Sequence, residues 1–315
     1  MTANRHESGL VEGIVVRIDS HFPLIESGES RYRCSLRKKL KRGHRTATHK
    51  ICVGDRVLFA PPASDKDSGV IEKILPRNTQ LIRRASHRDG MAQALVANVD
   101  RLIVVASARQ PPLNPRLIDR MLVAGENGDL ECFICINKMD LAKRDEVLPL
   151  VSYYPQLNYK LLFTSAKTGE GLEGLKDVLK DKSSVFAGAS GVGKSTLLNA
   201  IQPGLRLTVR EVSEVTGKGK HTTSFVQLLR LDFGGYVVDT PGIREFGLWD
   251  MDKHDLQYFF PEMQPFIGRC KYADCTHAHE PQCAVKAAVE AGNITRARYE
   301  SYMHILETVR VKGRR

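Results

Sequence analysis

The stretch GASGVGKS at residues 188–195 constrains this chain more than any other, because it fits the phosphate-loop pattern G-x-x-x-x-G-K-[ST]. An apolar run, SSVFA, precedes the loop, and KSTLLNAI after it has a helical pattern. Glycines let backbone N–H groups turn toward phosphate oxygens, and the dipole of the following helix favours the same negative charge. The motif therefore predicts a nucleotide-binding strand, loop and helix. Such a unit usually opens its domain, whereas here 187 residues precede Gly188.

The chain around this motif alternates between strand and helix patterns. Strands are predicted within 100–108, 130–138 and 159–167, and helices within 114–128 and 171–181. This alternation favours a doubly wound, mostly parallel sheet. Ligands of such sheets bind beyond the carboxyl ends of the strands, and every motif below follows a predicted strand.

The stretch NKMD at 137–140 indicates which base is bound. The Asp140 carboxylate can accept hydrogen bonds from guanine N1–H and the exocyclic amine, donors that adenine lacks at those positions. Adenine would leave this charged acceptor unpaired, a penalty that can give selectivity on the order of 10⁴. Asn137 and Lys138 are expected to brace the loop and the base. The stretch SAK at 165–167, after the next strand, adds backbone amides and a lysine stem beside the base.

Two further motifs are expected near the γ-phosphate. DTPG follows the strand pattern YVVD, so Asp239 is expected to hold Mg²⁺ through water and the Gly242 amide to contact the γ-phosphate. HTT at 221–223 lies in a Gly-rich, basic stretch. Thr222 or Thr223 is expected to complete the Mg²⁺ shell, as a switch loop does when the γ-phosphate is present. Together these motifs predict a GTP site.

The residues predicted to contact the nucleotide come from all of these motifs: Asn137, Lys138, Met139, Asp140, Ser165, Ala166, Lys167, Gly188, Ala189, Ser190, Gly191, Val192, Gly193, Lys194, Ser195, Thr196, Asp239 and Gly242. Lys194 is expected to reach the β- and γ-phosphates, and Ser195 and Asp239 to bind Mg²⁺. Lys194, Thr222 and Thr223 are therefore candidate catalytic groups.

The order of the motifs explains the late phosphate loop. A Ras-like GTPase runs phosphate loop, switch threonine, DxxG, NKxD and SAK. This chain runs NKMD, SAK, GASGVGKS, HTT and DTPG, which is a cyclic rotation. Because the termini of a domain often lie close together, permutation can preserve a fold. The residues before Gly188 therefore hold the guanine-reading half of the domain, with a further domain ahead of it.

That first domain has a β pattern and a strong positive charge. Residues 8–80 form short strand-like runs between Gly, Ser, Pro and Asp clusters, which favours a five-stranded OB-type barrel, with an SH3-like barrel as the alternative. Residues 1–97 carry 18 Lys+Arg and 10 Asp+Glu, or +8 of the net +11. Nine Lys/Arg and no acid lie within 31–50. This run favours a polyanion through counterion release, and the simpler interpretation is a solvated basic hairpin.

The last segment carries a cluster of metal-ligating residues. CKYADCTHAHEPQC places Cys270, Cys275, His277 and Cys283 in a C-x4-C-x-H-x5-C arrangement. Three thiolates and one imidazole suit tetrahedral Zn²⁺, and four protein ligands leave no open position, so a structural site is predicted. His279 is an alternative source of the imidazole.

Cys132 and Cys135 form a second C-x-x-C pattern, inside the predicted strand ECFICI. Residues i and i+3 of a strand point to opposite faces and cannot readily share a metal. We therefore interpret both as core residues.

With a permuted motif order between a basic barrel and a Cys/His module, the chain resembles the RsgA family of circularly permuted GTPases over nearly its whole length. We place an OB-fold RNA-binding domain at 1–88, the GTPase domain at 89–248 and an α-rich zinc-binding module at 249–315. The resemblance implies hydrolysis of GTP to GDP and phosphate, stimulated by the 30S ribosomal subunit late in its assembly. It also implies contact with 16S rRNA and matches the zinc-ligand spacing.

The residue that orients the attacking water is not the usual one. Ras-like enzymes have a Gln directly after DxxG, and here that position is Ile243, which has no polar atom. We expect slow intrinsic hydrolysis and another group in that role. His221, beside the switch threonines, is the candidate, and the resemblance implies the same role. The alternative is an exposed loop histidine without a role.

Composition limits the remaining classes. Seven cysteines, an odd number, do not indicate a secreted disulfide framework, and the N-terminus lacks the apolar region of a secretory signal. The apolar run LIVVASA is far shorter than the roughly 20 residues of a membrane span. We expect a cytoplasmic monomer without a membrane partner. The alternatives are an RNA-binding protein in which GTP hydrolysis is incidental, and a GTPase acting on tRNA or membranes.

Overall fold

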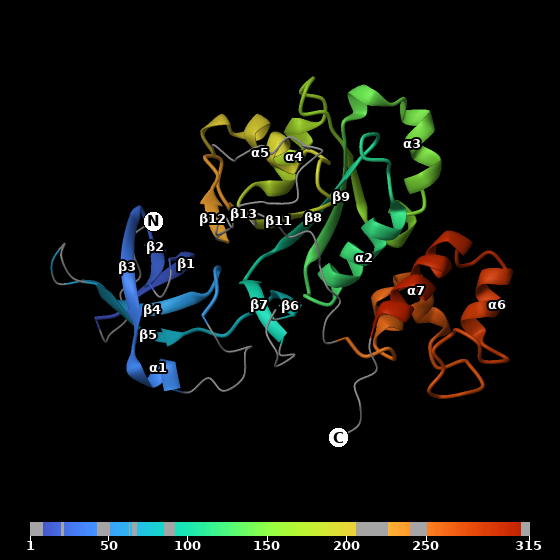
Figure 1. Cartoon of the computed structure of the whole chain (residues 1–315), viewed down its shortest axis with the longest axis horizontal. Helices are drawn as coiled ribbons and strands as arrows, with labels where there is room; N and C mark the ends of the chain where they lie inside the picture. The colour runs from blue at the N-terminus through green and yellow to red at the C-terminus, as the bar shows by residue number, and fades with distance from the viewer. Residues whose placement is uncertain are drawn as a thin grey trace, which may run out of the picture.

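The computed structural model describes residues 9–19, 22–42, 51–62, 64, 68–84, 92–205, 226–239 and 251–309. Three parts follow one another across the molecule (Figure 1). A β-barrel lies at one end, an α/β domain lies in the middle, and a helical C-terminal module packs beside the α/β domain at the other end. No helix among the described residues is long and apolar enough to cross a membrane.

The N-terminal barrel closes through five strands: β1 (Val11–Asp19), β2 (Phe22–Ser27), β3 (Ser30–Leu36), β4 (Arg56–Ala60) and β5 (Gly69–Ile74). β1 pairs with β2 and β4, and β2 pairs with β3. β5 closes the barrel by pairing with β3 in parallel and with β4 in antiparallel orientation. Val15, Ile25, Val57, Phe59 and Ile71 fill the interior. This closed order confirms the OB-type barrel and excludes the SH3-like alternative.

The basic run of the barrel is described only in part. Helix α1 (Lys38–Arg42) follows β3, and its Lys38 and Lys39 are exposed. Arg31 and Arg37 form ion pairs with Glu26 and Glu72. The second half of the run, 43–50, lies outside the described residues.

A hairpin of β6 (Gln80–Arg84) and β7 (Ala92–Ala97) links the barrel to the α/β domain. The predicted domain boundary at 88/89 falls between these strands, at residues that the structure does not describe. The boundary therefore stays a prediction.

The α/β domain contains a six-stranded sheet in the order β10 (Lys160–Phe163), β9 (Glu131–Asn137), β8 (Arg101–Ser107), β11 (Ser183–Ala187), β13 (Tyr236–Asp239) and β12 (Gln227–Arg230). Its pairings are parallel except for β12 against β13. β12 also pairs with β1 through Gln227 and Arg17, so the barrel continues the sheet. The predicted doubly wound sheet is confirmed.

Helices cover both faces of this sheet because successive apolar side chains of its buried strands point to opposite faces. In β8, Leu102 and Val104 point to one apolar cluster, and Ile103 and Val105 to the other. Helices α2 (Pro115–Glu126) and α3 (Arg144–Val151) pack on the first face, and α4 (Leu172–Leu179) and α5 (Lys194–Ile201) on the second. Short 3₁₀ turns η2 (Met139–Leu141), η3 (Pro155–Leu157) and η4 (Pro203–Leu205) complete the domain.

The start of α2 shows how local sequence sets one of these helices. The side chain of Asn114 accepts a hydrogen bond from the Leu117 N–H, and Pro115 occupies the first helical position. Both residue types suit a helix N-terminus, because the first N–H groups have no partner within the helix. The predicted helix within 114–128 is thereby confirmed.

The C-terminal module consists of η5 (Leu256–Phe259), η6 (Pro261–Phe266), α6 (Ala284–Glu290) and α7 (Arg296–Thr308). Figure 1 shows α7 lying beside α2 of the α/β domain. Their contact contains a buried ion network. Arg298 donates to Asp119 at 2.6 Å and to Glu262 at 2.6 Å, and the Tyr154 hydroxyl donates to Asp119 at 2.6 Å. Arg298 is 1% exposed, so one guanidinium joins carboxylates of two domains away from water.

Replacing Arg298 with Ala should destabilise the protein by about 3–5 kcal/mol, because it leaves two buried carboxylates without their cation. Urea denaturation followed by circular dichroism measures the change. The matched control is Arg296→Ala, two residues earlier on α7. The side chain of Arg296 is 87% exposed. That variant should lose less than about 0.5 kcal/mol. Equal losses in the two variants would contradict a structural role for the network.

Candidate nucleotide-binding and metal sites

The phosphate loop connects the end of β11 to the start of α5, as the sequence predicts. Two of its glycines lie where an added side chain would meet a close neighbour. A Cβ atom on Gly188 would lie 2.2 Å from the carbonyl oxygen of Val105, and one on Gly193 would lie 2.4 Å from Nδ2 of Asn137. Gly193 also has φ +95°, a conformation that L side chains rarely adopt. Glycine at 188 therefore lets the loop pass close to the backbone of β8, and glycine at 193 leaves room for the Asn137 side chain.

Lys194 begins α5 and turns back over the loop. Its Nζ donates to the carbonyl oxygens of Gly188 at 2.8 Å and Ala189 at 2.9 Å. The ammonium group is thus held at the loop, where phosphate oxygens offer stronger, charge-assisted acceptors than carbonyl groups. Ser195 follows in the first turn of the helix and is half-buried.

Asn137 ties the NKMD and SAK motifs to the phosphate loop. Its Nδ2 donates to the carbonyl oxygen of Val192 at 2.9 Å. Its Oδ1 accepts from the Thr164 hydroxyl at 3.3 Å and from the Ala166 N–H at 3.4 Å. Because Asn137 is 1% exposed, the side chain is a bridge among three loops rather than a surface group.

The rest of the NKMD and SAK motifs lie side by side. The Ser165 hydroxyl donates to Asp140 Oδ1 at 2.7 Å, which orients the exposed carboxylate. Lys138 adopts φ +63° and donates from Nζ to the carbonyl oxygen of Gln110 at 2.5 Å. Met139 buries its side chain in the core, so only its backbone faces the loop. Lys167 is exposed.

The remaining predicted residues divide into two groups. In the phosphate loop, Val192 packs in the core, Ser190 and Thr196 are exposed, and Gly191 has positive φ. The groups expected around the γ-phosphate and Mg²⁺ lie mostly outside the described residues, namely His221, Thr222, Thr223 and Gly242. For Asp239 the structure gives only its backbone position at the end of β13.

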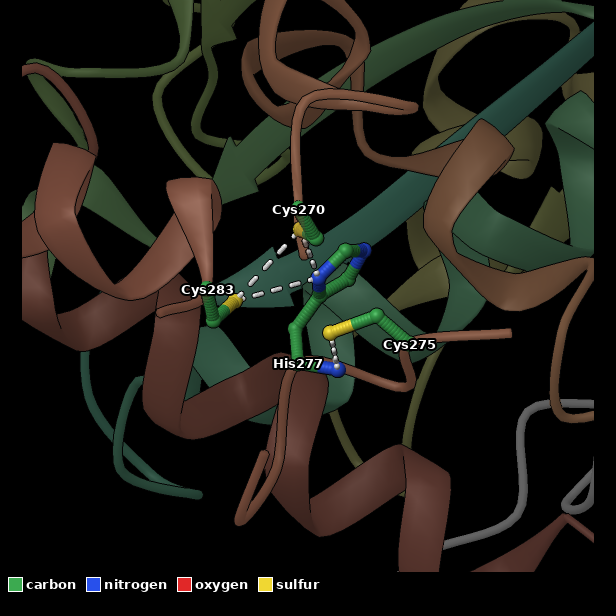
Figure 2. A group of neighbouring side chains, drawn as sticks. All are labelled: Cys270, Cys275, His277 and Cys283. Atoms are coloured by element: carbon green, nitrogen blue, oxygen red, sulfur yellow. Dashed lines mark hydrogen bonds between the residues drawn. The ribbon is translucent and has the colours of Figure 1, made fainter. Parts of the chain in front are cut away.

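The structure brings together the four predicted metal ligands of the C-terminal module. The ligand atoms of Cys270, Cys275, His277 and Cys283 all lie within 4.8 Å of one another (Figure 2). Cys270 Sγ lies 3.8 Å from Cys283 Sγ, and His277 Nδ1 lies 3.5 Å and 3.3 Å from these two sulfurs. A tetrahedral ion with Zn–S bonds of about 2.3 Å separates its sulfurs by roughly 3.8 Å, so the donor set fits Zn²⁺. His279 is not part of this group.

The surroundings of the cluster hold its ligands in place. Backbone N–H groups of Ala284 and Lys286 donate to Cys270 and Cys283, and the N–H of His277 donates to Cys275. Burial raises the pKa of the Cys275 thiol to about 12, since a thiolate away from water is costly without a nearby cation. Burial also lowers the pKa of His277, which favours the neutral imidazole that a metal requires.

Cys132 and Cys135 take no part in this group and pack in the core on opposite faces of β9. Burial raises the pKa of both thiols, that of Cys135 to about 12. The geometry agrees with the interpretation of both as inert core residues.

Several supporting residues carry no signal in the sequence. Thr164 bridges Asn137 and Cys135, and Gln257 contacts His277. The hydroxyls of Tyr299 and Tyr302 on α7 donate to the carbonyl oxygens of His277 and Thr276. Their roles depend on contacts between segments far apart in the chain, and no spacing rule identifies such contacts.

A profile of the RsgA GTPase family matches residues 74–249, more than half of the chain. The chain belongs to the RsgA GTPase family. It is therefore a GTP-hydrolysing enzyme with a circularly permuted motif order, as its sequence predicts.

Relatives of the RsgA family match nearly the whole chain. The small ribosomal subunit biogenesis GTPase RsgA of Thermotoga maritima is 45% identical over 296 residues, covering 92% of this chain and 94% of that protein. The protein of the same name from Chlorobaculum tepidum is 39% identical over 306 residues, with 95% and 98% covered.

Two crystal structures share the fold. YjeQ from Thermotoga maritima superposes with a TM-score of 0.76 at 41% identity, covering 96% of this chain and 99% of that one. YloQ, a circularly permuted GTPase, has a TM-score of 0.72 at 31% identity, with 97% of each chain covered.

Replacing Gly193 with Ala should weaken GDP binding at least about tenfold, because the added Cβ displaces Asn137 and strains a left-handed residue. Titration of a fluorescent GDP analogue measures the affinity. The control is Gly174→Ala in α4, where an added Cβ meets nothing within 4 Å. This variant should keep its GDP affinity and gain about 0.5–1 kcal/mol of stability. Unchanged affinity in Gly193→Ala would refute the tight fit between the two loops.

Proposed function

We propose that this chain is a GTPase that binds the small (30S) ribosomal subunit and acts late in its assembly, with hydrolysis stimulated by that subunit. The observation that carries the proposal is the hydrogen bond from Asn137 to the Val192 carbonyl, which connects the NKMD loop to the phosphate loop in one nucleotide site. The curated relatives named as small ribosomal subunit biogenesis GTPases support the choice of partner.

The guanine base is assigned to Asp140, with Asn137, Lys138 and the SAK segment around it. The Ser165 hydroxyl occupies one side of Oδ1, which fixes the carboxylate while leaving acceptor capacity for N1–H and the exocyclic amine. Lys138 lends its stem to the base. The specificity for guanine thus comes from an oriented charge whose partner donors exist only on guanine.

The phosphates are assigned to the loop from Gly188 to Thr196. Backbone N–H groups of this loop and the first turn of α5 are expected to surround the phosphate oxygens, and Lys194 to balance their charge. Ser195 and Asp239 would hold Mg²⁺, with Thr222 or Thr223, and that ion would neutralise charge on the β- and γ-phosphates. The Gly242 amide would contact the γ-phosphate.

The C-terminal cluster is proposed to hold one structural Zn²⁺ through Cys270, Cys275, His277 and Cys283. The four donors sit at separations suited to a single tetrahedral ion. With no fifth position open, the ion would stabilise the module and leave the chemistry to the nucleotide site.

Contact with 16S rRNA is proposed for the barrel. Lys38 and Lys39 of α1 lie within the basic run and are exposed, so they can neutralise phosphates. Several barrel arginines instead pair with acids, as Arg31 does with Glu26 and Arg56 with Glu12. We propose further that the protein works as a monomer in the cytoplasm, where ribosomal subunits are assembled.

GTP turnover measured with purified 30S subunits, with 50S subunits and with neither tests the proposed function. We expect strong stimulation by 30S subunits alone and slow turnover otherwise, because Ile243 offers no group to orient water. Equal turnover in all three samples would reject subunit-dependent hydrolysis. The chain would then be better described as a GTP-binding RNA-binding protein in which hydrolysis is incidental.

His221 is proposed to position the attacking water. His221→Ala should lower the 30S-stimulated turnover by roughly 10²-fold or more while the affinity for GTP changes little, since the imidazole acts in the hydrolytic step. Single-turnover kinetics and nucleotide titration separate these quantities. His304→Ala, which removes an exposed histidine of α7, is the control and should behave like the wild type. A His221→Ala enzyme with full stimulated turnover would remove His221 from the mechanism.

A further inference from the structure

The imidazole of His277 has a second partner besides the thiol groups. Its Nε2 lies 2.7 Å from Oε1 of Gln257, a residue of η5 that is remote from the cysteines in sequence. Figure 2 shows the other side of the same ring, where Nδ1 faces the sulfurs of Cys270 and Cys283. One ring nitrogen therefore faces the thiols and the other faces an amide.

The orientation of the Gln257 amide follows from its other contact. Its Nε2 donates to the carbonyl oxygen of His254 at 2.7 Å, and a carbonyl oxygen can only accept. The amide nitrogen is thereby engaged with His254, and the amide oxygen is the atom that faces His277. An amide oxygen is an acceptor, so the Nε2 of His277 must carry the hydrogen.

A hydrogen on Nε2 determines which nitrogen is available to a metal. In a neutral imidazole only one nitrogen carries a hydrogen, so Nδ1 has the free lone pair. That lone pair points to the sulfurs of Cys270 and Cys283, at the separations that a shared tetrahedral ion requires. The two hydrogen bonds of Gln257, to the His254 carbonyl and to His277, thus select the His277 tautomer that has a free lone pair on Nδ1.

We propose that Gln257 is the outer-sphere residue that holds His277 as an Nδ1 ligand of the metal site. This inference rests on the proposed Zn²⁺ site and goes beyond it by assigning a residue outside the C-x4-C-x-H-x5-C pattern. Residues that accept a hydrogen bond from a ligating histidine commonly change metal affinity 10–100-fold when removed.

The hydrogen bond between Gln257 and His277 also links the Cys/His cluster to η5. Its neighbour Leu256 and the following Phe260 are fully buried, and η5 contacts both α2 and α7. Arg298 of α7 lies over the Phe260 ring, 4.5 Å from its centroid. The imidazole of the metal site is therefore connected, through one side chain, to the segment that packs against the GTPase domain.

The test compares Zn²⁺ affinities of the full-length protein by competition with a chromophoric chelator. Gln257→Leu removes the acceptor and should weaken Zn²⁺ binding 10–100-fold. Gln257→Glu keeps an acceptor oxygen for Nε2–H but loses the donor to the His254 carbonyl, so its Zn²⁺ affinity should lie between those of the wild type and Gln257→Leu. Gln264→Leu is the control, since the exposed Gln264 side chain donates to the Tyr258 carbonyl and not to the cluster.

Each outcome bears on a separate claim. A wild-type protein that binds no Zn²⁺ would overturn the metal site and the role of Gln257 with it. Tight binding by the wild type and equally tight binding by Gln257→Leu would overturn only the role of Gln257, and the metal site would stand.

A measurement on the wild type covers the case in which Gln257→Leu does not fold. Long-range ¹H–¹⁵N spectra of the ¹⁵N-histidine-labelled, Zn²⁺-loaded protein report which nitrogen carries the hydrogen. The His277 signal is the one that changes when the ion is removed by a chelator. We expect a protonated Nε2 and a metal-bound Nδ1. A metal-bound Nε2 would overturn the proposal.

Discussion

The nucleotide site depends on one buried amide. Asn137 donates to the Val192 carbonyl and accepts from Thr164 and Ala166, so it fixes the NKMD, SAK and phosphate loops at one edge of the sheet. In a Ras-like chain order the NKxD and SAK loops follow the phosphate loop, whereas here NKMD (137–140) and SAK (165–167) both precede Gly188. The side-chain bridge forms in either order, because it depends on strand ends that meet in space and not on the path between them. This explains how a cyclic rotation of the motifs can leave a GTPase site intact.

The two flanking parts join this domain by different interactions. The barrel continues the sheet through the β1–β12 pairing and through the Tyr236 hydroxyl, which donates to Glu26 at 2.7 Å. The C-terminal module instead packs α7 on α2 around the buried Arg298 network. These charged groups are buried only because they pair with one another, since a charge left unpaired in a low-dielectric interior is costly. The Cys/His cluster belongs to the same module and is joined through His277 to η5, which also takes part in this contact.

Sequence reasoning identified most elements and failed where local signals were weak. Most strands and helices of the α/β domain were predicted within a few residues, since long apolar runs and a capped helix such as α2 are strong patterns. No range was predicted for β12 or α3. Strand β2, FPLIES, forms within the region predicted to be a barrel although it contains Pro23, a residue that disfavours strand interiors. The β6–β7 hairpin was not predicted. The α-rich character predicted for 249–315 is confirmed by α6 and α7, and α7 begins after the Thr295 N-cap.

The sequence by itself determined the identity of the chemical groups. A phosphate loop, the aspartate of an NKxD motif and a Cys₃His set are local patterns whose residue types suit phosphate, guanine and Zn²⁺. Only the tertiary structure decided how these groups are held. It placed His277 rather than His279 among the thiols, turned its Nδ1 toward them through Gln257, and joined Arg298 to Asp119 across 179 residues. Such choices depend on how distant segments pack, and the free energy of a buried contact is set by its surroundings rather than by its position in the chain.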